Sequence, residues 1–382
     1  MDACRDVCRD ACRAAARATI NVGGPFRTTF RTTFRTTFRG AIGAGVAAAI
    51  AMPGGASLAA APASQYASTR YPIVLVHGRS GAGKMGGVVD YWYGMPQLLR
   101  AHGARVYVAT LSAYESDEQR ALQLASFVRG IKLATGADKV NLIGHSQGGT
   151  TSRVFAAMAP QDVASITTIG SPHRGIEGQE SLRQAGSRLA HVPVLGPLLI
   201  GVVTVFYEAL GTIQGVSNGR VLPQDWQANV RSLSTSGAAA QNARLDAALK
   251  PGTPSALGPD CRTEGATTEM REGVDANGNK TTYVHAAYSW TGRGGRFSLL
   301  RSNLLDPSTY KFAISARRLE QQGVGPNDGL VSVCSSKWGK VLSTSYYWNH
   351  FDEVNQILGM HQDVDPRTVL LNHANRLRRD NL

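Results

Sequence analysis

The sequence lacks the composition of a nucleic-acid-binding protein. Such proteins carry a basic stripe with interleaved aromatic residues. Here aromatic residues make up only 7% of 382 residues, and the surplus of 40 Lys and Arg over 27 Asp and Glu is spread along the chain. The densest basic cluster is Arg376, Arg378 and Arg379 near the C-terminus. We therefore exclude nucleic acid as a partner.

The sequence also lacks an N-terminal apolar run of transmembrane length. Ala41–Met52 is apolar but too short to cross a bilayer as a permanent anchor. It follows three basic Phe-Arg-Thr-Thr repeats and precedes the small residues Ala59–Ala63. A basic region, a short apolar core and a small-residue site are the parts of a secretory signal. We predict that residues 1–63 are a leader, removed as the protein is secreted through the periplasm, and that residues 64–382 form a single domain.

Cysteine is scarce, with 5 residues in the whole chain. Cys4, Cys8 and Cys12 lie in the predicted leader, so only Cys261 and Cys334 remain after its removal. An even pair in an exported chain indicates one disulfide. The alternative is a pair of buried free thiols.

A phosphate-binding loop is present only in part. Residues 78–84 follow a predicted strand and nearly match the pattern G-x-x-x-x-G-K-[ST]. Met85 stands where that pattern needs a hydroxyl to hold Mg²⁺. We therefore exclude a nucleotide hydrolase.

What the sequence does contain is a strong nucleophile motif. The apolar run 140–143 leads into Gly144-His-Ser-Gln-Gly148, and residues 150–159 have helical character. This is the G-x-S-x-G nucleophile elbow, in which a sharp strand-to-helix turn exposes the hydroxyl of Ser146 above the sheet. The glycines are needed because strand and helix crowd each other at that turn.

The order of the predicted elements indicates an α/β fold. Hydrophobic residues make up 43% of the chain, enough for a sizeable core. Strands that alternate with helices imply crossover connections and a parallel sheet. We predict strands at 71–78, 106–111, 139–143, 163–169, 283–290 and 341–348, helices at 90–102, 118–134, 150–159 and 366–377, and a hairpin turn at 275–278.

One apolar segment interrupts this alternation. Residues 182–213 are rich in Val, Leu and Phe and are broken by Pro193 and Pro197. The segment could be a core helix. We favour a mobile lid at residues 176–220, because it directly follows a strand end, where ligands bind in such sheets.

A serine nucleophile needs a histidine base and a carboxylate that orients it. His350 follows the last predicted strand, whereas His373 lies on an apparent closing helix. Asp328 lies in a tight loop before a predicted strand at 330–333. We therefore predict Asp328 and His350 as the acid and the base. The other candidates are His173, His191, His285 and His361 for the base, and Asp306, Asp352, Asp363 and Asp365 for the acid.

The oxyanion formed in an acyl transfer needs two N–H donors. One comes from the residue after the serine, here Gln147, and the other from a loop after an earlier strand. The loop after strand 71–78 makes the N–H of Arg79 the second predicted donor.

The motifs taken together resemble those of the secreted, foldase-dependent bacterial triacylglycerol lipases of α/β-hydrolase fold. The resemblance covers residues 71–377 and rests on YPIVLVHG, VNLIGHSQGG, TTIGSPHRG, LDPST, NDGLVS and LSTSYYWNHFDEVNQ. It implies a mostly parallel central sheet with helices on both faces and a helical lid. It also implies that Ser146, Asp328 and His350 are the triad and that Cys261 pairs with Cys334.

The resemblance implies further properties. One structural Ca²⁺ would be held by the carboxylates of Asp306 and Asp352 and by the backbone carbonyls of Gln356 and Met360. A membrane-anchored foldase would assist folding, and the mature protein would act as a monomer. One position departs from the family: Arg79 stands where Leu is common.

The resemblance implies an enzyme that hydrolyses long-chain acylglycerols at an oil–water interface. Two alternatives stay open. One is an esterase or polyester depolymerase on the same fold. The other is a non-catalytic lipid-binding protein that uses the apolar segment 182–213.

Overall fold

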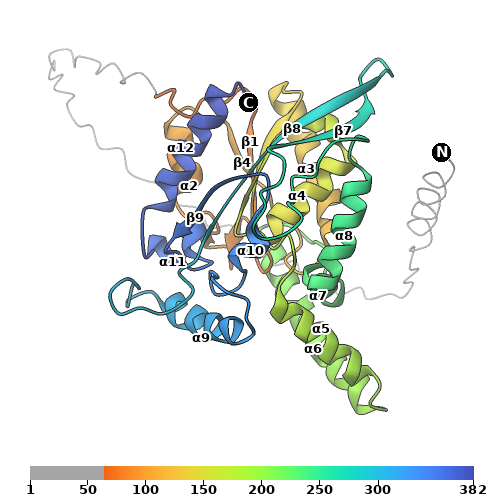
Figure 1. The fold of residues 1–382 in the computed structure, drawn as a ribbon, viewed down its shortest axis with the longest axis vertical. Helices are drawn as coiled ribbons and strands as arrows, with labels where there is room; N and C mark the ends of the chain where they lie inside the picture. The colour runs from red at the N-terminus through yellow and green to blue at the C-terminus, as the bar shows by residue number, and fades with distance from the viewer. Residues whose placement is uncertain (1–63) are drawn as a thin grey trace, which may run out of the picture. The chain divides into compact units, whose positions relative to one another are not determined.

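A single seven-stranded sheet forms the centre of the molecule (Figure 1). The computed structural model describes residues 64–382, so the predicted leader and Cys4, Cys8 and Cys12 lie outside the described residues. The strands follow the order β4-β1-β5-β6-β8-β7, and β9 also pairs with β8. All neighbours are parallel except the antiparallel pair β7 and β8. The strands are β1 Ile73–Val76, β4 Val106–Val108, β5 Val140–His145, β6 Val163–Ile169, β7 Thr268–Val274, β8 Lys280–Gly292 and β9 Lys340–Tyr346.

Helices cover both faces of the sheet, as predicted (Figure 1). Every residue of β1, β5 and β6 is buried, as expected for central strands covered on both sides. One face carries α3 (Asp117–Thr135), α4 (Gln147–Met158) and α8 (Thr235–Ala247), and the other carries α2 (Met95–Ala101) and α12 (Pro366–Arg379).

The side chains of β1 point alternately to the two faces of the sheet and pack in two separate hydrophobic cores. Val74 and Val76 belong to the cluster that includes Phe155 of α4, whereas Ile73 and Leu75 belong to the cluster that includes Leu370 of α12. Successive residues of a strand point to opposite faces, so the run IVLV supplies apolar side chains to both.

Two predicted elements are wrong at the edge of the site. The expected strand 330–333 is a turn, because the Asp328 carboxylate accepts hydrogen bonds from the N–H groups of Leu330 and Val331 at 2.8 and 2.7 Å. Ser332 then caps α10 (Val333–Ser336).

The helix expected at 90–102 begins only at Met95, after Gly94 with φ 71°. Before it, β2 (Lys84–Met85) and β3 (Val89–Asp90) form a small antiparallel pair.

The sequence interpretation missed two helices that line the site. The side chain of Asp225 caps α7 (Trp226–Leu233), and that of Asp306 caps α9 (Pro307–Gln321). An Asp at the N-cap followed by helix formers, with Pro in the first turn of α9, is a recognisable start signal. The remaining short elements are η1 (Pro160–Asp162), η2 (Asp352–Val354) and α11 (Gln356–Gly359).

The segment predicted as a lid forms two helices, α5 (Glu177–Ala190) and α6 (Leu195–Val216). They project from the end of the sheet (Figure 1). Within residues 64–382, α6 alone is long and apolar enough to cross a membrane, but a single such helix is weak evidence for a span. Its exposed apolar side chains are Leu195, Leu198, Leu199, Val202, Val203, Val205, Phe206, Leu210, Ile213 and Val216.

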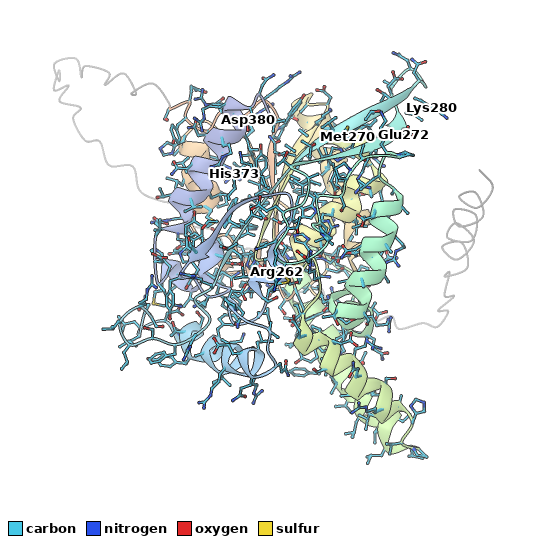
Figure 2. The ribbon with its side chains drawn as sticks, in the orientation of Figure 1. Arg262, Met270, Glu272, Lys280, His373 and Asp380 are labelled. Carbon is cyan, nitrogen blue, oxygen red and sulfur yellow. A yellow bond between two sulfur atoms is a disulfide. The ribbon has the colours of Figure 1, made fainter. Side chains whose placement is uncertain are left out.

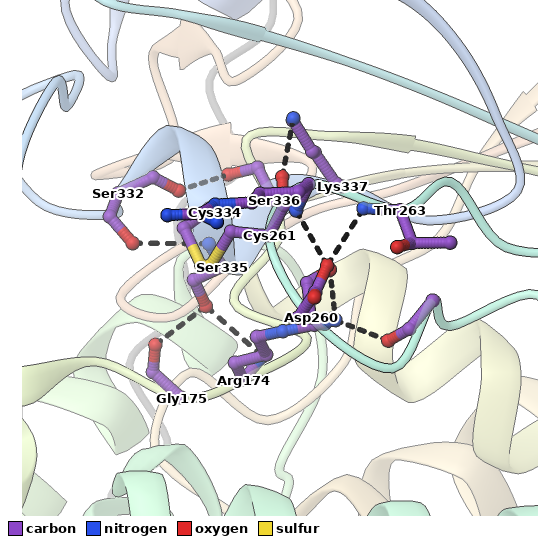
Figure 3. The surroundings of a disulfide bond; sticks show 12 residues. Arg174, Gly175, Asp260, Cys261, Thr263, Ser332, Cys334, Ser335, Ser336 and Lys337 are labelled. Carbon is purple, nitrogen blue, oxygen red and sulfur yellow. Dashed lines mark hydrogen bonds between the residues drawn. A yellow bond between two sulfur atoms is a disulfide. The ribbon is translucent and has the colours of Figure 1, made fainter.

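A disulfide joins Cys261 to Cys334, the pairing that the resemblance implies (Figure 3). Cys334 lies in α10, and the carbonyl of Cys261 accepts a hydrogen bond from Lys337 Nζ at 2.7 Å. Ser335 Oγ of the same helix donates to the carbonyl of Gly175 at 2.7 Å. The bridge therefore ties a distant loop to the short helix that follows Asp328.

Replacing both cysteines by serine should destabilise the protein. The bridge spans 73 residues, and in the chain-entropy model closing a loop of that length is worth about 4 kcal/mol of unfolding free energy. Chemical unfolding followed by tryptophan fluorescence would measure the loss. The matched control is reductant, which should weaken the unaltered protein and leave the double variant unchanged. An equal free energy of unfolding for the unaltered protein and the double serine variant, both without reductant, would contradict this account.

Candidate active site

Ser146 lies in a strained turn between β5 and α4. Its backbone has φ 55° and ψ −130°, a region that costs energy for any residue with a side chain. A Cβ on Gly144 would lie 2.4 Å from the carbonyl carbon of Gly148, and one on Gly148 would lie 2.1 Å from the carbonyl oxygen of Val76. The two glycines are therefore required by the close approach of strand and helix, as the motif predicts.

His350 is held by Asp328. Its Nδ1 lies 2.7 Å from Asp328 Oδ2, and its backbone N–H donates to the Asp328 carbonyl at 2.9 Å. Both side chains are buried. The ring of His350 lies 4.6 Å from that of His145, the residue before Ser146. The structure therefore brings the predicted acid and base into contact beside the turn that carries Ser146.

Within residues 64–382, no hydrogen bond of ordinary length joins Ser146 to His350. Catalytic hydrogen bonds are often long in enzymes without bound substrate and tighten when it binds. Ser146 thus lies in its turn near a buried imidazole that a carboxylate orients.

The two predicted oxyanion donors lie on either side of Ser146. Gln147 is the first residue of α4, and its side chain is fixed by Nε2, which donates to the Glu115 carbonyl at 2.8 Å. A Cβ on Gly78 would lie 2.6 Å from Ser146 Cβ, so the loop that carries Arg79 passes directly over the serine. In the described part of the chain, neither the Gln147 nor the Arg79 N–H donates a hydrogen bond to another group. Both N–H groups are free to donate to a ligand oxygen.

Arg120 holds the loop of Gly78 and Arg79 in place through hydrogen bonds. This fully buried guanidinium donates through Nη2 to the His77 carbonyl at 2.5 Å and through Nε to Thr151 Oγ1 at 3.1 Å. Burial lowers the pKa of Arg120 to about 10, so it stays charged at neutral pH, where Asp117 partly offsets the cost. The sequence interpretation missed Arg120, since an Arg in a predicted helix is normally exposed.

A buried chain of hydrogen bonds links the oxyanion loop, the elbow and the histidine loop. The N–H of Gly78 donates to Tyr91 Oη at 3.0 Å, and that hydroxyl lies 2.6 Å from His145 Nδ1. His145 Nε2 in turn lies 3.2 Å from Glu353 Oε2. Burial, followed by the neighbouring His350, lowers the pKa of His145 well below its usual value. The imidazole of His145 is therefore held between the Tyr91 hydroxyl and the Glu353 carboxyl group.

Glu353 is a second buried carboxylate beside His350. Its Oε1 accepts from the Gly292 N–H at 2.6 Å, and its Oε2 lies 3.8 Å from His350 Nδ1. Burial, and after it the Asp328 charge, raise the pKa of Glu353 well above its usual value. The sequence interpretation missed Glu353. The one feature that could have indicated it is its position three residues after the predicted base, His350. His145, His350 and Glu353 could geometrically share a metal ion, but hydrogen bonds already occupy their facing atoms.

A further pair of buried carboxylates lies behind the histidine loop. Asp306 and Asp352 are 0% and 1% exposed, and Asp352 Oδ1 has no hydrogen-bond partner within the described residues. Burial, with Asp306 as a further cause, raises the pKa of Asp352 well above its usual value. Two adjacent buried carboxylates with one unsatisfied oxygen suit a hard divalent cation. Gln356 and Met360, the predicted carbonyl ligands, lie in the α11 turn that follows.

The competing candidates are occupied elsewhere. His373, on α12 (Figure 2), lies 2.7 Å from Thr167 Oγ1, and burial lowers its pKa to about 3. His173 stacks on Trp338, and His285 bonds the Pro160 carbonyl. The other candidates bond to neighbouring backbone: His191 and His361 to nearby carbonyls, and Asp363 and Asp365 to nearby N–H groups.

Comparison with known proteins identifies the family. A model of the alpha/beta hydrolase fold matches residues 71–192. A triacylglycerol lipase of Burkholderia plantarii is 42% identical over 85% of this chain and 90% of its own length. One from Pseudarthrobacter phenanthrenivorans is 42% identical over 83% and 99%, and one from Vibrio cholerae serotype O1 is 38% identical over 86% and 94%. The chain belongs to the bacterial triacylglycerol lipase family. Members of this lipase family are serine ester hydrolases.

We expect Glu353 to replace Asp328 in part when the latter is removed. Asp328→Ala should lower kcat/KM of this lipase-family enzyme on a soluble ester by about 10²-fold, whereas the double variant Asp328→Ala/Glu353→Gln should lose about 10⁴-fold, the usual effect of losing the orienting carboxylate. Steady-state kinetics on p-nitrophenyl butyrate would measure both.

Glu353→Gln alone is the control, since the amide oxygen still accepts from the Gly292 N–H. Melting curves would check that each variant is folded. Equal losses in the Asp328 single and double variants would show that Glu353 gives no support to His350.

Proposed function

We propose that this protein is a triacylglycerol lipase that hydrolyses long-chain acylglycerols at an oil–water interface. The observation that carries the proposal is the buried 2.7 Å contact between His350 and Asp328 beside the strained backbone of Ser146. The lipase activity of the relatives supports the reaction class.

In the proposed reaction, His350 removes the proton of Ser146 Oγ as the oxygen attacks the ester carbonyl. The N–H groups of Gln147 and Arg79 bind the oxyanion, assisted by the positive end of α4. Asp328 keeps the His350 proton on Nδ1 and stabilises the imidazolium. His350 then protonates the leaving alcohol, and water, activated by the same histidine, releases the fatty acid.

The apolar helix α6 supports action on lipid. At least ten of its large apolar side chains are exposed, including Phe206 at 58% and Val205 at 67%. Such a surface is unfavourable in water and favourable against oil. Tyr207 of α6 stacks on Trp226 of α7 with ring centroids 3.7 Å apart, which anchors the helix beside the site. We propose that α5 and α6 are the lid.

Ser146→Ala should abolish hydrolysis of emulsified triolein, with a loss of about 10⁶-fold in kcat, since the nucleophile and base act as a unit. Titration of released fatty acid would measure it. Ser345→Ala, at an exposed serine of β9, is the matched control and should keep full activity. Undiminished hydrolysis in Ser146→Ala would exclude the proposed nucleophile, and activity on soluble short esters alone would assign the protein as an esterase.

We further propose one structural Ca²⁺ between Asp306 and Asp352, completed by the carbonyls of Gln356 and Met360. When bound, the ion would neutralise the two carboxylates. Asp352 accepts a hydrogen bond from the Asn349 N–H at 2.9 Å, next to His350. Through that contact Asp352 orients the loop that carries His350. Asp306 also caps α9, so it connects this loop to that helix.

Chelation should therefore lower both thermal stability and activity. Anything that binds only the folded state stabilises it in proportion to its occupancy, so EDTA should lower Tm by several degrees, and Ca²⁺ should restore it better than Mg²⁺. The double variant Asp306→Asn/Asp352→Asn should melt at the same temperature with and without EDTA. An unaltered protein insensitive to chelation would exclude the site.

Export is supported by the disulfide, because such bonds persist in oxidising compartments. We propose that the protein is secreted as a monomer after folding with a membrane-anchored foldase. A large non-local sheet that must assemble with a disulfide folds slowly, which is consistent with a need for assistance. Full activity of protein produced without any foldase would exclude that partner, and a dimer in sedimentation analysis would exclude the monomer.

A further inference from the structure

Arg79 places a positive charge beside the candidate active site. Its guanidinium carbon lies 4.5 Å from the ring centroid of Trp226 and 5.8 Å from that of Tyr114. Stacking on aromatic faces fixes the side chain in position. Since its backbone lies next to Ser146, the charge is held only a side-chain length from the reacting atom.

Lys311 places a second positive charge near His350. It lies on α9, with Nζ 5.0 Å from the ring centroid of Phe351 and 5.3 Å from that of Phe312. Phe312 in turn contacts His350, with ring centroids 6.2 Å apart. Desolvation of its ammonium group, and then the Arg79 charge, lower the pKa of Lys311, although the residue as a whole is exposed. Arg79 beside Ser146 and Lys311 beside Phe312 and Phe351 therefore both lie around the candidate active site.

Neither cation has a carboxylate partner. Within residues 64–382, no ion pair includes Arg79 or Lys311. Two acids near Trp226 bond to backbone instead: Glu208 accepts from the Trp226 N–H at 3.4 Å, and Asp225 accepts from the Ala228 N–H at 2.7 Å. Arg79 is partly buried, whereas Lys311 is exposed, and a partly buried charge without a counter-ion is unfavourable. A bound anion would relieve that cost.

We propose that Arg79 and Lys311 form an anion subsite, which binds a phosphate or carboxylate group carried by the substrate a few bonds from the scissile ester. The subsite rests on the proposed function, since it is defined relative to Ser146. It extends the substrate class from neutral acylglycerols to anionic esters. Arg is suited to this role because its planar guanidinium binds both anions through paired hydrogen bonds.

The test compares matched pairs of anionic and neutral esters. Mono-p-nitrophenyl adipate and p-nitrophenyl hexanoate have acyl chains of equal length and differ in the terminal carboxylate. Oleoyl lysophosphatidate and monoolein, both in neutral detergent micelles, differ in the phosphate on the alcohol side. The measured quantity is the ratio of kcat/KM for the anionic ester to that for its neutral partner, so changes common to both substrates cancel.

Arg79→Leu and Lys311→Met should each lower that ratio by about fivefold, and the double variant more, because each removes one charge from a partly solvated site. Arg79→Leu retains the backbone N–H. Arg317→Gln, at an exposed position of α9 outside this cluster, is the matched control and should leave the ratio unchanged. Raising the salt concentration should lower the ratio of the unaltered enzyme.

If the variants lower the ratio only for adipate against hexanoate, the subsite lies on the acyl side of the ester. If they lower it only for lysophosphatidate against monoolein, the subsite lies on the alcohol side. Either result supports the proposal. Ratios unchanged within twofold in the double variant would overturn it. Failure of the unaltered enzyme on neutral and anionic esters alike would instead overturn the proposed function.

Discussion

The close approach of β5, α4 and the end of β1 is the constraint on which the site depends. Gly148 passes so near Val76 that a methyl group would overlap its carbonyl oxygen. That approach forces Ser146 into a backbone conformation that few residues adopt. It also brings the loop of Gly78 over the serine, so one strained turn positions both the proposed nucleophile and a proposed oxyanion donor.

Buried charge is concentrated on the loop that carries His350. Asp352 and Glu353 are buried on that loop, and Asp328 is buried beside it. Burial, followed by the Asp328 charge, raises the pKa of Glu353, so ionising these neighbours together is costly. Hydrogen bonds offset part of that cost, as at Asp328, which accepts from two backbone N–H groups. Asp352 keeps one oxygen unsatisfied. These buried negative charges need protons or a bound cation to compensate for them. The position of His350 therefore depends on pH and on the concentration of cations.

The surroundings of the site combine two unlike surfaces. The helix α6 presents apolar side chains, whereas Arg79 and Lys311 present charge. Trp226 joins the two, since one face stacks on Tyr207 of α6 and the ring also lies against Arg79. The proposed contact with oil and the proposed recognition of an anionic group would therefore use adjoining parts of one aromatic cluster, and a movement of α6 would alter both.

Hydrophobic periodicity and turn glycines are local signals, so the parallel sheet, the elbow turn at Ser146 and the strand that ends before His350 could be predicted from the sequence alone. It did not determine the turn at Leu330, which depends on a side chain folding back onto its own backbone. The contacts of Arg120 and Glu353, and those that hold Arg79 and Lys311 beside the site, follow only from the tertiary structure. These contacts join residues far apart in the chain, and charged residues carry no periodic signal that distinguishes a buried position from an exposed one.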